Sequence, residues 1–228
     1  YFYPLIKNPF RKKDLLQAHL KSLESICGIQ EPQKDVSQIL NSFSESRGGQ
    51  LWYPYIGSGR GRGPFVELID GAVKYDLING IGVHGFGHSN PDFIEAQINA
   101  SLEDTCMQGN LQQNEANVRL LEDMRQLLNK DGCRMDHVFL STSGAMANEN
   151  ALKIAFQKKG GSRVLAFTNN FAGRSMSMSA ISDKPQYRDG LPYSLHVDYV
   201  PFYDETDPKG SLLDTIESIK SHLHRYPH

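Results

Sequence analysis

The sequence predicts an α/β fold in which a mostly parallel sheet is flanked by helices, after an N-terminal segment with helices and a β-hairpin. Two observations carry this prediction. From residue 137 onward, short apolar runs alternate with amphipathic segments, as in chains whose helices connect parallel strands. Earlier in the chain, the turn pair Asp70-Gly71 separates two apolar stretches, which is typical of an antiparallel hairpin.

Each element follows from its own local pattern. Apolar runs predict hairpin strands over 65–70 and 73–78, and parallel strands over 138–140, 163–167 and 195–200. Apolar residues at helical spacing predict helices over 13–26, 36–43, 91–98, 114–129 and 211–224, and a further helix from residue 144. Asn90 is expected to cap its helix with Pro91 in the first turn. The polar stretch 44–49 is expected to be a connector.

The composition is that of an ordinary globular protein. Of the 228 residues, 39% are hydrophobic, enough for a core, and the net charge of −2 gives no basis for binding nucleic acid or an anionic membrane. No apolar run approaches the roughly 20 residues that cross a bilayer. Cys27, Cys106 and Cys133 lack motif spacing, which favours a cytoplasmic protein over a disulfide framework. The sequence starts at Tyr1, without a Met and without a signal-peptide pattern, so we expect Tyr1 not to be the natural start of the protein.

The segment 141–149 (Ser-Thr-Ser-Gly-Ala-Met-Ala-Asn-Glu) joins a predicted strand to a predicted helix through small residues. Such a turn directs free backbone N–H groups and the positive end of the helix dipole at one point, where a phosphate commonly binds. Gly144 and Ala145 lack bulk, and the Ser143 hydroxyl can donate a further hydrogen bond. The alternative is a turn that serves packing only.

The loop 169–176, beyond the predicted strand 163–167, contains Phe171 and Arg174. A flat aromatic side chain at a strand end can lie on a ring-shaped ligand, and the planar fork of arginine can bind a carboxylate through two hydrogen bonds. The alternatives are an aromatic side chain buried under the loop and an exposed arginine in a local salt bridge.

Four stretches, in this order, resemble the class III, fold type I aminotransferases that use pyridoxal 5'-phosphate (PLP), such as the acetylornithine, ornithine and 4-aminobutyrate aminotransferases. They are the hairpin region 63–77, the glycine-rich stretch 81–91, the turn 141–149 and the loop 169–176. The resemblance implies that Ser143, Gly144 and Ala145 bind the cofactor phosphate and that Phe171 lies on its ring. The residues that it places at the substrate are Arg174 and Ile81. The sequence departs from the family at Met146, where Glu is usual, and at Ala172, where His or Trp is usual.

The resemblance also implies what the chain lacks and what it binds. The family's Schiff-base lysine and the elements around it have no match, so no catalytic residue is assigned and we expect the N-terminal half of an aminotransferase, incomplete as a catalyst. Residues 1–88 would be the N-terminal segment of the small domain, and residues 89–228 the first half of the PLP-binding large domain. The expected substrates are an amino-acid or ω-amine donor and a 2-oxo acid acceptor, in a homodimer that binds no nucleic acid or membrane.

Several alternatives stay open. A class III aminomutase, decarboxylase or epimerase would share the phosphate turn, and an inactive fragment could serve as a binding or dimerisation module. The glycine-rich stretch 57–63 is not expected to bind a dinucleotide, because no strand–turn–helix unit surrounds it, and its Arg60 and Arg62 are expected in solvent or at a subunit contact. No metal is expected, since the histidine pairs lack supporting Cys or acidic clusters.

Overall fold

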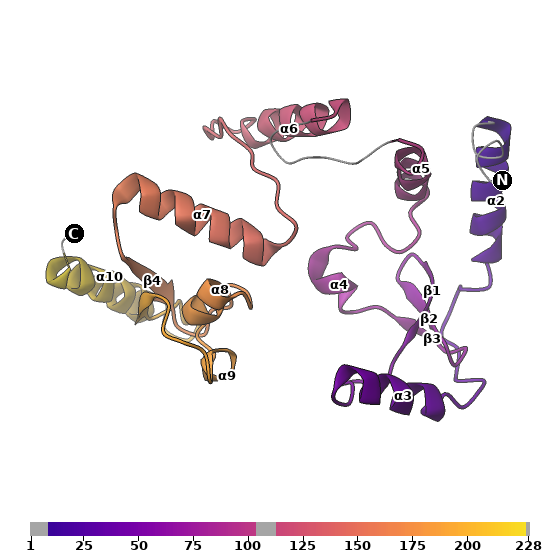
Figure 1. Ribbon diagram of the computed structural model, residues 1–228, viewed down its shortest axis with the longest axis horizontal. Helices are drawn as coiled ribbons and strands as arrows, with labels where there is room; N and C mark the ends of the chain where they lie inside the picture. The colour runs from indigo at the N-terminus through magenta and orange to yellow at the C-terminus, as the bar shows by residue number, and fades with distance from the viewer. Residues whose placement is uncertain (1–8, 104–112, 227–228) are drawn as a thin grey trace. The chain divides into compact units, whose positions relative to one another are not determined.

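The computed structural model describes residues 9–103 and 113–226, and the chain divides into two compact units, Tyr1–Asn114 and Glu115–His228 (Figure 1). Cys106 lies outside the described residues, whereas Cys27 and Cys133 are free and exposed. The first unit contains α2 (Pro9–Ser22), α3 (Ser37–Arg47), β1 (Gly57–Arg62), β2 (Phe65–Leu68), β3 (Val73–Tyr75), α4 (Asn79–Gly82) and α5 (Pro91–Ala100).

A three-stranded antiparallel sheet in the order β1-β2-β3 forms the centre of the first unit. The predicted hairpin is confirmed as β2 and β3, shorter than expected at both strands. The glycine-rich stretch at 57–62 is a third strand that pairs with β2. Arg60, which was expected in solvent or at a subunit contact, is partly exposed, and its guanidinium pairs with Glu67 across the sheet at 2.9 Å, because the two side chains share one face of neighbouring strands.

The core of this unit consists of Leu23, Ile26 and Val73, each 1% exposed. The helix expected over 13–26 ends at Ser22, so Leu23 and Ile26 lie in the turns that follow it. Both amides bond to the carbonyl three residues earlier, which tightens the chain and still directs these side chains inward. The expected cap of α5 is confirmed, because Asn90 Oδ1 accepts from the amides at the start of that helix.

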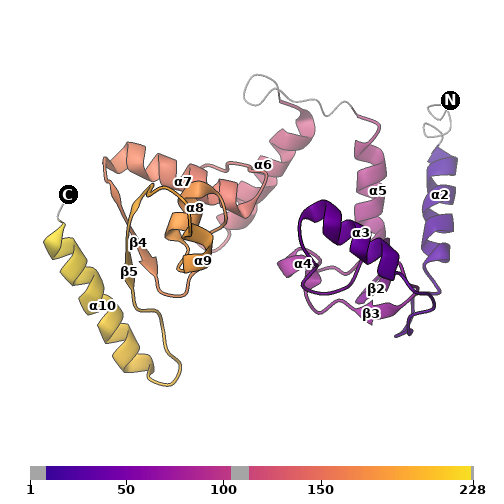
Figure 2. The same ribbon diagram turned by 60° about the horizontal axis from the view of Figure 1, so that its bottom comes forward.

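The second unit contains α6 (Glu115–Leu128), α7 (Gly144–Lys159), β4 (Arg163–Phe167), α8 (Met176–Ile181), α9 (Pro185–Arg188), β5 (His196–Val200) and α10 (Pro208–Arg225). Strands β4 and β5 are parallel, with Arg163 opposite His196 and Phe167 opposite Val200. Figure 2 shows α7 and α8 on one face of this strand pair and α10 on the other. The core lies on the α7–α8 face and includes Ala166, Met178 and Ile181.

One expectation for the second unit is wrong. Residues 138–140 form no strand, and Phe139 and Leu140 are 65% and 46% exposed. A strand requires a hydrogen-bonded neighbour, and the parallel sheet of the described residues contains only β4 and β5. Helix α6 has the predicted position, but none of its residues is buried. Among the described residues, no helix is both long and apolar enough to span a membrane.

Candidate functional site

The N-terminus of α7 brings together the three residues expected to bind a phosphate. Ser143 has an extended backbone and caps the helix, where its Oγ accepts a hydrogen bond from the Met146 amide at 3.2 Å. Gly144 and Ala145 occupy the first two helical positions, whose N–H groups have no acceptor within a helix. The Ser143 hydroxyl proton stays available as a third donor, because the cap uses only an oxygen lone pair.

The space in front of this helix end suits an anion. A side chain added at Gly144 would meet no atom within 4 Å, and both Ser143 and Gly144 are exposed. Helix α7 has 16 residues, so its dipole adds a partial positive charge at the same point. Open space, backbone donors and positive potential together form an arrangement that binds phosphate or carboxylate groups in proteins.

The β4–α8 loop (residues 168–175) packs against this helix start. Gly173 has a φ of 142°, and a Cβ at this position would lie 2.8 Å from the Cβ of Ala145. Only a residue without a side chain permits so close an approach. Next to this contact, Asn148 Nδ2 donates to the carbonyl of Ala172 at 2.9 Å. The loop is thereby attached to the helix that carries the phosphate-binding candidates.

Two side chains beyond α8 hold the loop from another side. Ser182 is fully buried, and its Oγ accepts from the Ala172 amide at 2.9 Å and donates to the Gly173 carbonyl at 3.2 Å. Asp183 Oδ2 accepts from the Asn169 amide at 2.8 Å. Neither Ser182 nor Asp183 belongs to a motif, so no signal in the sequence identifies them; their role arises because α8 returns the chain to the loop.

Phe171 and Arg174 extend from this anchored loop. Phe171 is 61% exposed, and its ring meets Tyr187 edge-on with centroids 5.8 Å apart. Arg174 is exposed and forms no hydrogen bond or ion pair within the described part of the chain. The two alternatives expected for this loop therefore do not apply within the described residues: Phe171 is not buried, and Arg174 is not in a local salt bridge. An apolar ring and a free guanidinium are both available to a ligand.

Glu149 has a different partner from the one that the sequence predicts. Its position early in α7 predicts dipole and capping interactions, but its Oε1 accepts a hydrogen bond from Ser175 Oγ at 2.6 Å. Ser175 immediately precedes α8 and follows Arg174. The carboxylate of Glu149 thus holds the end of the β4–α8 loop, and the cap of α7 is made by Ser143.

Ile81, expected at the substrate site, belongs to the other compact unit. It lies in α4, is 91% exposed and has a φ of 59°, a left-handed conformation that is rare for a β-branched residue. The carboxylate of Asp76 holds this turn, since Oδ1 accepts from the amides of Ile78 and Asn79 at 3.1 and 2.8 Å. Strained backbone is found preferentially at functional sites, and the substrate role of Ile81 stays a prediction.

The other oxygen of Asp76 pairs with His88. Oδ2 lies 2.8 Å from His88 Nε2, and this hydrogen bond, with that from the Asn79 amide, holds the pKa of Asp76 below its ordinary value. The ring of His84 lies against the ring of His88 with centroids 4.4 Å apart. The strained turn is thus held by a hydrogen-bonded carboxylate and two packed imidazoles.

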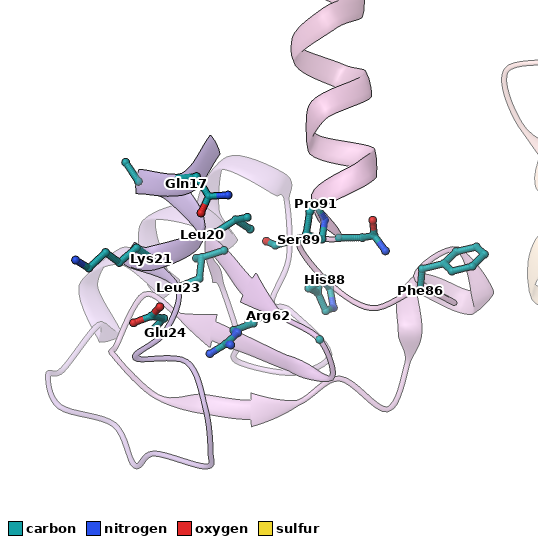
Figure 3. A pocket seen from close by; sticks show the side chains of 13 residues that line it. Gln17, Leu20, Lys21, Leu23, Glu24, Arg62, Phe86, His88, Ser89 and Pro91 are labelled. Carbon is teal, nitrogen blue, oxygen red and sulfur yellow. The ribbon is translucent and has the colours of Figure 1, made fainter. Parts of the chain in front are cut away.

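A cavity of about 650 Å³ also lies in the first unit, between α2, the end of β1 and residues 86–91 (Figure 3). Leu20 and Leu23 form apolar parts of its wall, and Arg62 and Glu24 contribute exposed charged groups. None of the residues predicted from the sequence to bind a cofactor or substrate lines this cavity. The predicted residues that the structure brings together are those at α7 and the β4–α8 loop.

Comparisons with known proteins match this chain over most of its length. A family model described as "Aminotransferase class-III" matches residues 51–226. The acetylornithine aminotransferase of Methanocaldococcus jannaschii is 31% identical over 166 residues, which are 70% of this chain and 40% of that protein. The acetylornithine aminotransferase of Corynebacterium efficiens is 33% identical over 172 residues, 70% of this chain and 42% of that protein. The chain thus spans about two fifths of the length of these relatives.

Solved structures show the same architecture at lower identity. An amine transaminase from an uncultivated Pseudomonas species, in a PLP-bound form, aligns with a TM-score of 0.65 at 22% identity over 75% of this chain and 41% of that one. The ornithine aminotransferase of Toxoplasma gondii aligns with a TM-score of 0.65 at 21% identity over 83% of this chain and 44% of that one. At these identities the likeness concerns the fold.

Proposed function

The chain belongs to the class III aminotransferase family, and from that premise we propose that it binds the phosphate and ring of PLP and the carboxylate of an amino-acid substrate. The fold class predicted from the sequence is confirmed, because the solved neighbours are fold type I transaminases and the parallel sheet is part of theirs. The reaction that we propose for the whole protein is transfer of an amino group from an amino acid or ω-amine to a 2-oxo acid.

One observation supports this proposal most: the start of α7 and the β4–α8 loop meet at Gly173 and Ala145. The phosphate of PLP would accept hydrogen bonds from the amides of Gly144 and Ala145 and from the Ser143 hydroxyl. The exposed ring of Phe171, on the adjoining loop, would lie on the cofactor ring and exclude water from it. When bound, PLP supplies an electron sink for the substrate's carbanion.

Arg174 is the proposed substrate contact. Its guanidinium has no partner among the described residues, so it can bind a carboxylate without first breaking an ion pair. Binding the carboxylate would orient the substrate amine toward the cofactor, which is positioning and not proton transfer. The substrate role of Ile81, which belongs to the other compact unit, stays a prediction from the sequence.

The remaining parts of the proposal concern the whole protein. We place the family's covalent lysine in the portion of the relatives that this chain does not span. The homodimer, the cytoplasmic location and the division between residues 88 and 89 stay predictions. The four matched proteins described above are named for acetylornithine, ornithine or a generic amine, so the donor is proposed only as a class.

Gly144→Glu tests the phosphate site, because it should change stability and affinity in different directions. A carboxylate at the first helical position favours the helix by about 0.3–1 kcal/mol but repels a phosphate in front of it. We expect unchanged or higher stability and at least about tenfold weaker PLP binding in titrations followed by cofactor absorbance. Gly161→Glu is the matched control, since it also has open space and lies outside the helix start. Equal PLP affinity in both variants would contradict the phosphate site.

Arg174→Ala tests the substrate role. The variant of the full-length enzyme should raise the KM for the amino-acid substrate about tenfold to a hundredfold and leave the absorbance of bound PLP unchanged. Arg134→Ala is the control, because Arg134 is an 89% exposed arginine of the same unit with only a 3.5 Å surface ion pair. A KM equal to that of the control would remove Arg174 from the substrate site.

A further inference from the structure

We propose that Asn148 and Glu149 are positioning residues, which together fix Arg174 relative to the phosphate-binding end of α7. This inference rests on the proposed function for the role of Arg174. The two residues are consecutive in α7 and hold the β4–α8 loop at two points, on either side of Gly173 and Arg174. Asn148 Nδ2 donates to the carbonyl of Ala172 at 2.9 Å, and Glu149 Oε1 accepts from Ser175 at 2.6 Å.

The spacing of the two anchors limits where Arg174 can lie. Ala172 and Ser175 are three residues apart, so the chain between them spans at most about 10 Å. The anchoring residues lie four and five positions after Gly144, which places them about 6–8 Å along the helix from its start. The contact of Gly173 with Ala145 closes the gap between these points. The backbone of Arg174 is therefore held within about two helical turns of the phosphate donors, while its side chain stays exposed.

The same arrangement keeps the guanidinium of Arg174 available. The carboxylate of Glu149 bonds to Ser175, the residue next to Arg174, and could instead form an ion pair with the guanidinium of Arg174. Such an ion pair would compete with a substrate carboxylate for Arg174. The half-buried carboxylate of Glu149 instead accepts the Ser175 hydroxyl at 2.6 Å, a short distance typical of a charge-assisted bond. Within the described residues, Arg174 has no hydrogen bond or ion pair. Glu149 thus fixes the loop through Ser175 and does not neutralise the arginine.

Amide hydrogen exchange of the chain without cofactor gives the first test. Glu149→Ala should speed exchange at the Ala172 amide, which donates to Ser182 Oγ in the anchored loop, about tenfold, whereas Glu149→Gln, which keeps an acceptor oxygen, should stay within about threefold of the unmodified protein. Asn150→Ala is the control, because the bond that its side chain makes among the described residues lies within α7, from Nδ2 to Met146 O. Adding Ser175→Ala to Glu149→Ala should change nothing further. Unchanged exchange in Glu149→Ala, or additive effects in the double variant, would overturn the anchor.

The second test measures the consequence for substrate in the full-length enzyme. Glu149→Ala should raise the KM for the amino-acid substrate about tenfold with kcat changed less than threefold, and Glu149→Gln should restore most of it. Combined with Arg174→Ala, Glu149→Ala should raise KM no further than Arg174→Ala alone. A fall in kcat without a change in KM would overturn the positioning role. If the unmodified protein does not bind PLP, the proposed function fails, and the exchange experiment still decides whether Glu149 anchors the loop.

Discussion

Replacing Gly173 with alanine should separate the β4–α8 loop from α7, and the cost can be worked from the geometry. The new methyl group would lie 2.8 Å from the Cβ of Ala145, closer than real Cβ atoms come, and 3.1 Å from that of Met178, which is a tight contact. Overpacking of this kind costs about 1–3 kcal/mol. The φ of 142° adds a conformational cost of about 1–3 kcal/mol for any residue with a side chain. The free energy of unfolding should therefore fall by about 2–6 kcal/mol.

Gly190→Ala separates the two contributions to this loss. Gly190 also has a positive φ, 75°, but a methyl group there would meet no atom within 4 Å. It should cost only the conformational part, about 1–2 kcal/mol. Urea unfolding followed by far-UV circular dichroism gives both values, and PLP titration should show weaker binding for Gly173→Ala alone. If the two variants differ in unfolding free energy by less than about 0.5 kcal/mol, the close contact with α7 is refuted.

Three further predictions concern other anchors. Ser182→Ala should lower the free energy of unfolding by about 1–3 kcal/mol in urea titrations, because it leaves the partly buried Ala172 amide and the carbonyl of the buried Gly173 without this partner; a neutral variant would contradict this. The pKa of Asp76 is lowered by His88, so this pair adds stability above about pH 4 that is lost as the pH falls through the folded-state pKa. Asp76→Asn should therefore be less stable at pH 7 and converge with the unmodified protein in acid, and a constant difference in Tm between pH 7 and 3 would refute the pairing. Arg163→Lys should lower the Tm, because lysine cannot form the two parallel hydrogen bonds that Arg163 makes to Asp198 at 2.8 and 2.9 Å; an unchanged Tm would exclude a stabilising pair.

Features whose determinants lie within a few residues are predictable from the sequence. The Asn90-Pro91 helix start and the Asp70-Gly71 turn carry their own caps and turn residues, and both are confirmed. Strand β1 was not predictable, because its glycine-rich sequence has low strand propensity and it is held extended by tertiary contacts, among them pairing with β2 and the Arg60–Glu67 bridge. Tertiary pairing here outweighs local preference.

The residues of the candidate site also fall into a group that local sequence predicts and a group that it does not. Ser143, Gly144 and Ala145 could be predicted because a helix start is a local feature with a recognisable turn before it. The anchors Glu149 and Ser182 could not, since each acts on a loop whose distance along the chain gives no hint of contact. A glutamate in the second turn of a helix and a serine after a short helix are common in proteins. Their roles follow only from the fold.

The predicted strand at 138–140 and the β4–α8 loop differ in what they need in order to form. The apolar residues of the predicted strand are of the kind that proteins bury, yet Phe139 and Leu140 are exposed. The same holds for apolar residues of α6 and α10, including Val118, which is 56% exposed, and Leu213, which is 65% exposed. Burying each such side chain would contribute about 1.5–3 kcal/mol, and the relatives of this chain are more than twice as long as the part it matches. The β4–α8 loop needs no such surface, because its anchors from α7 and from Ser182 lie within the same unit. The proposed phosphate-binding residues, Phe171 and Arg174 can therefore keep their mutual geometry beside the two-stranded parallel sheet of the described residues.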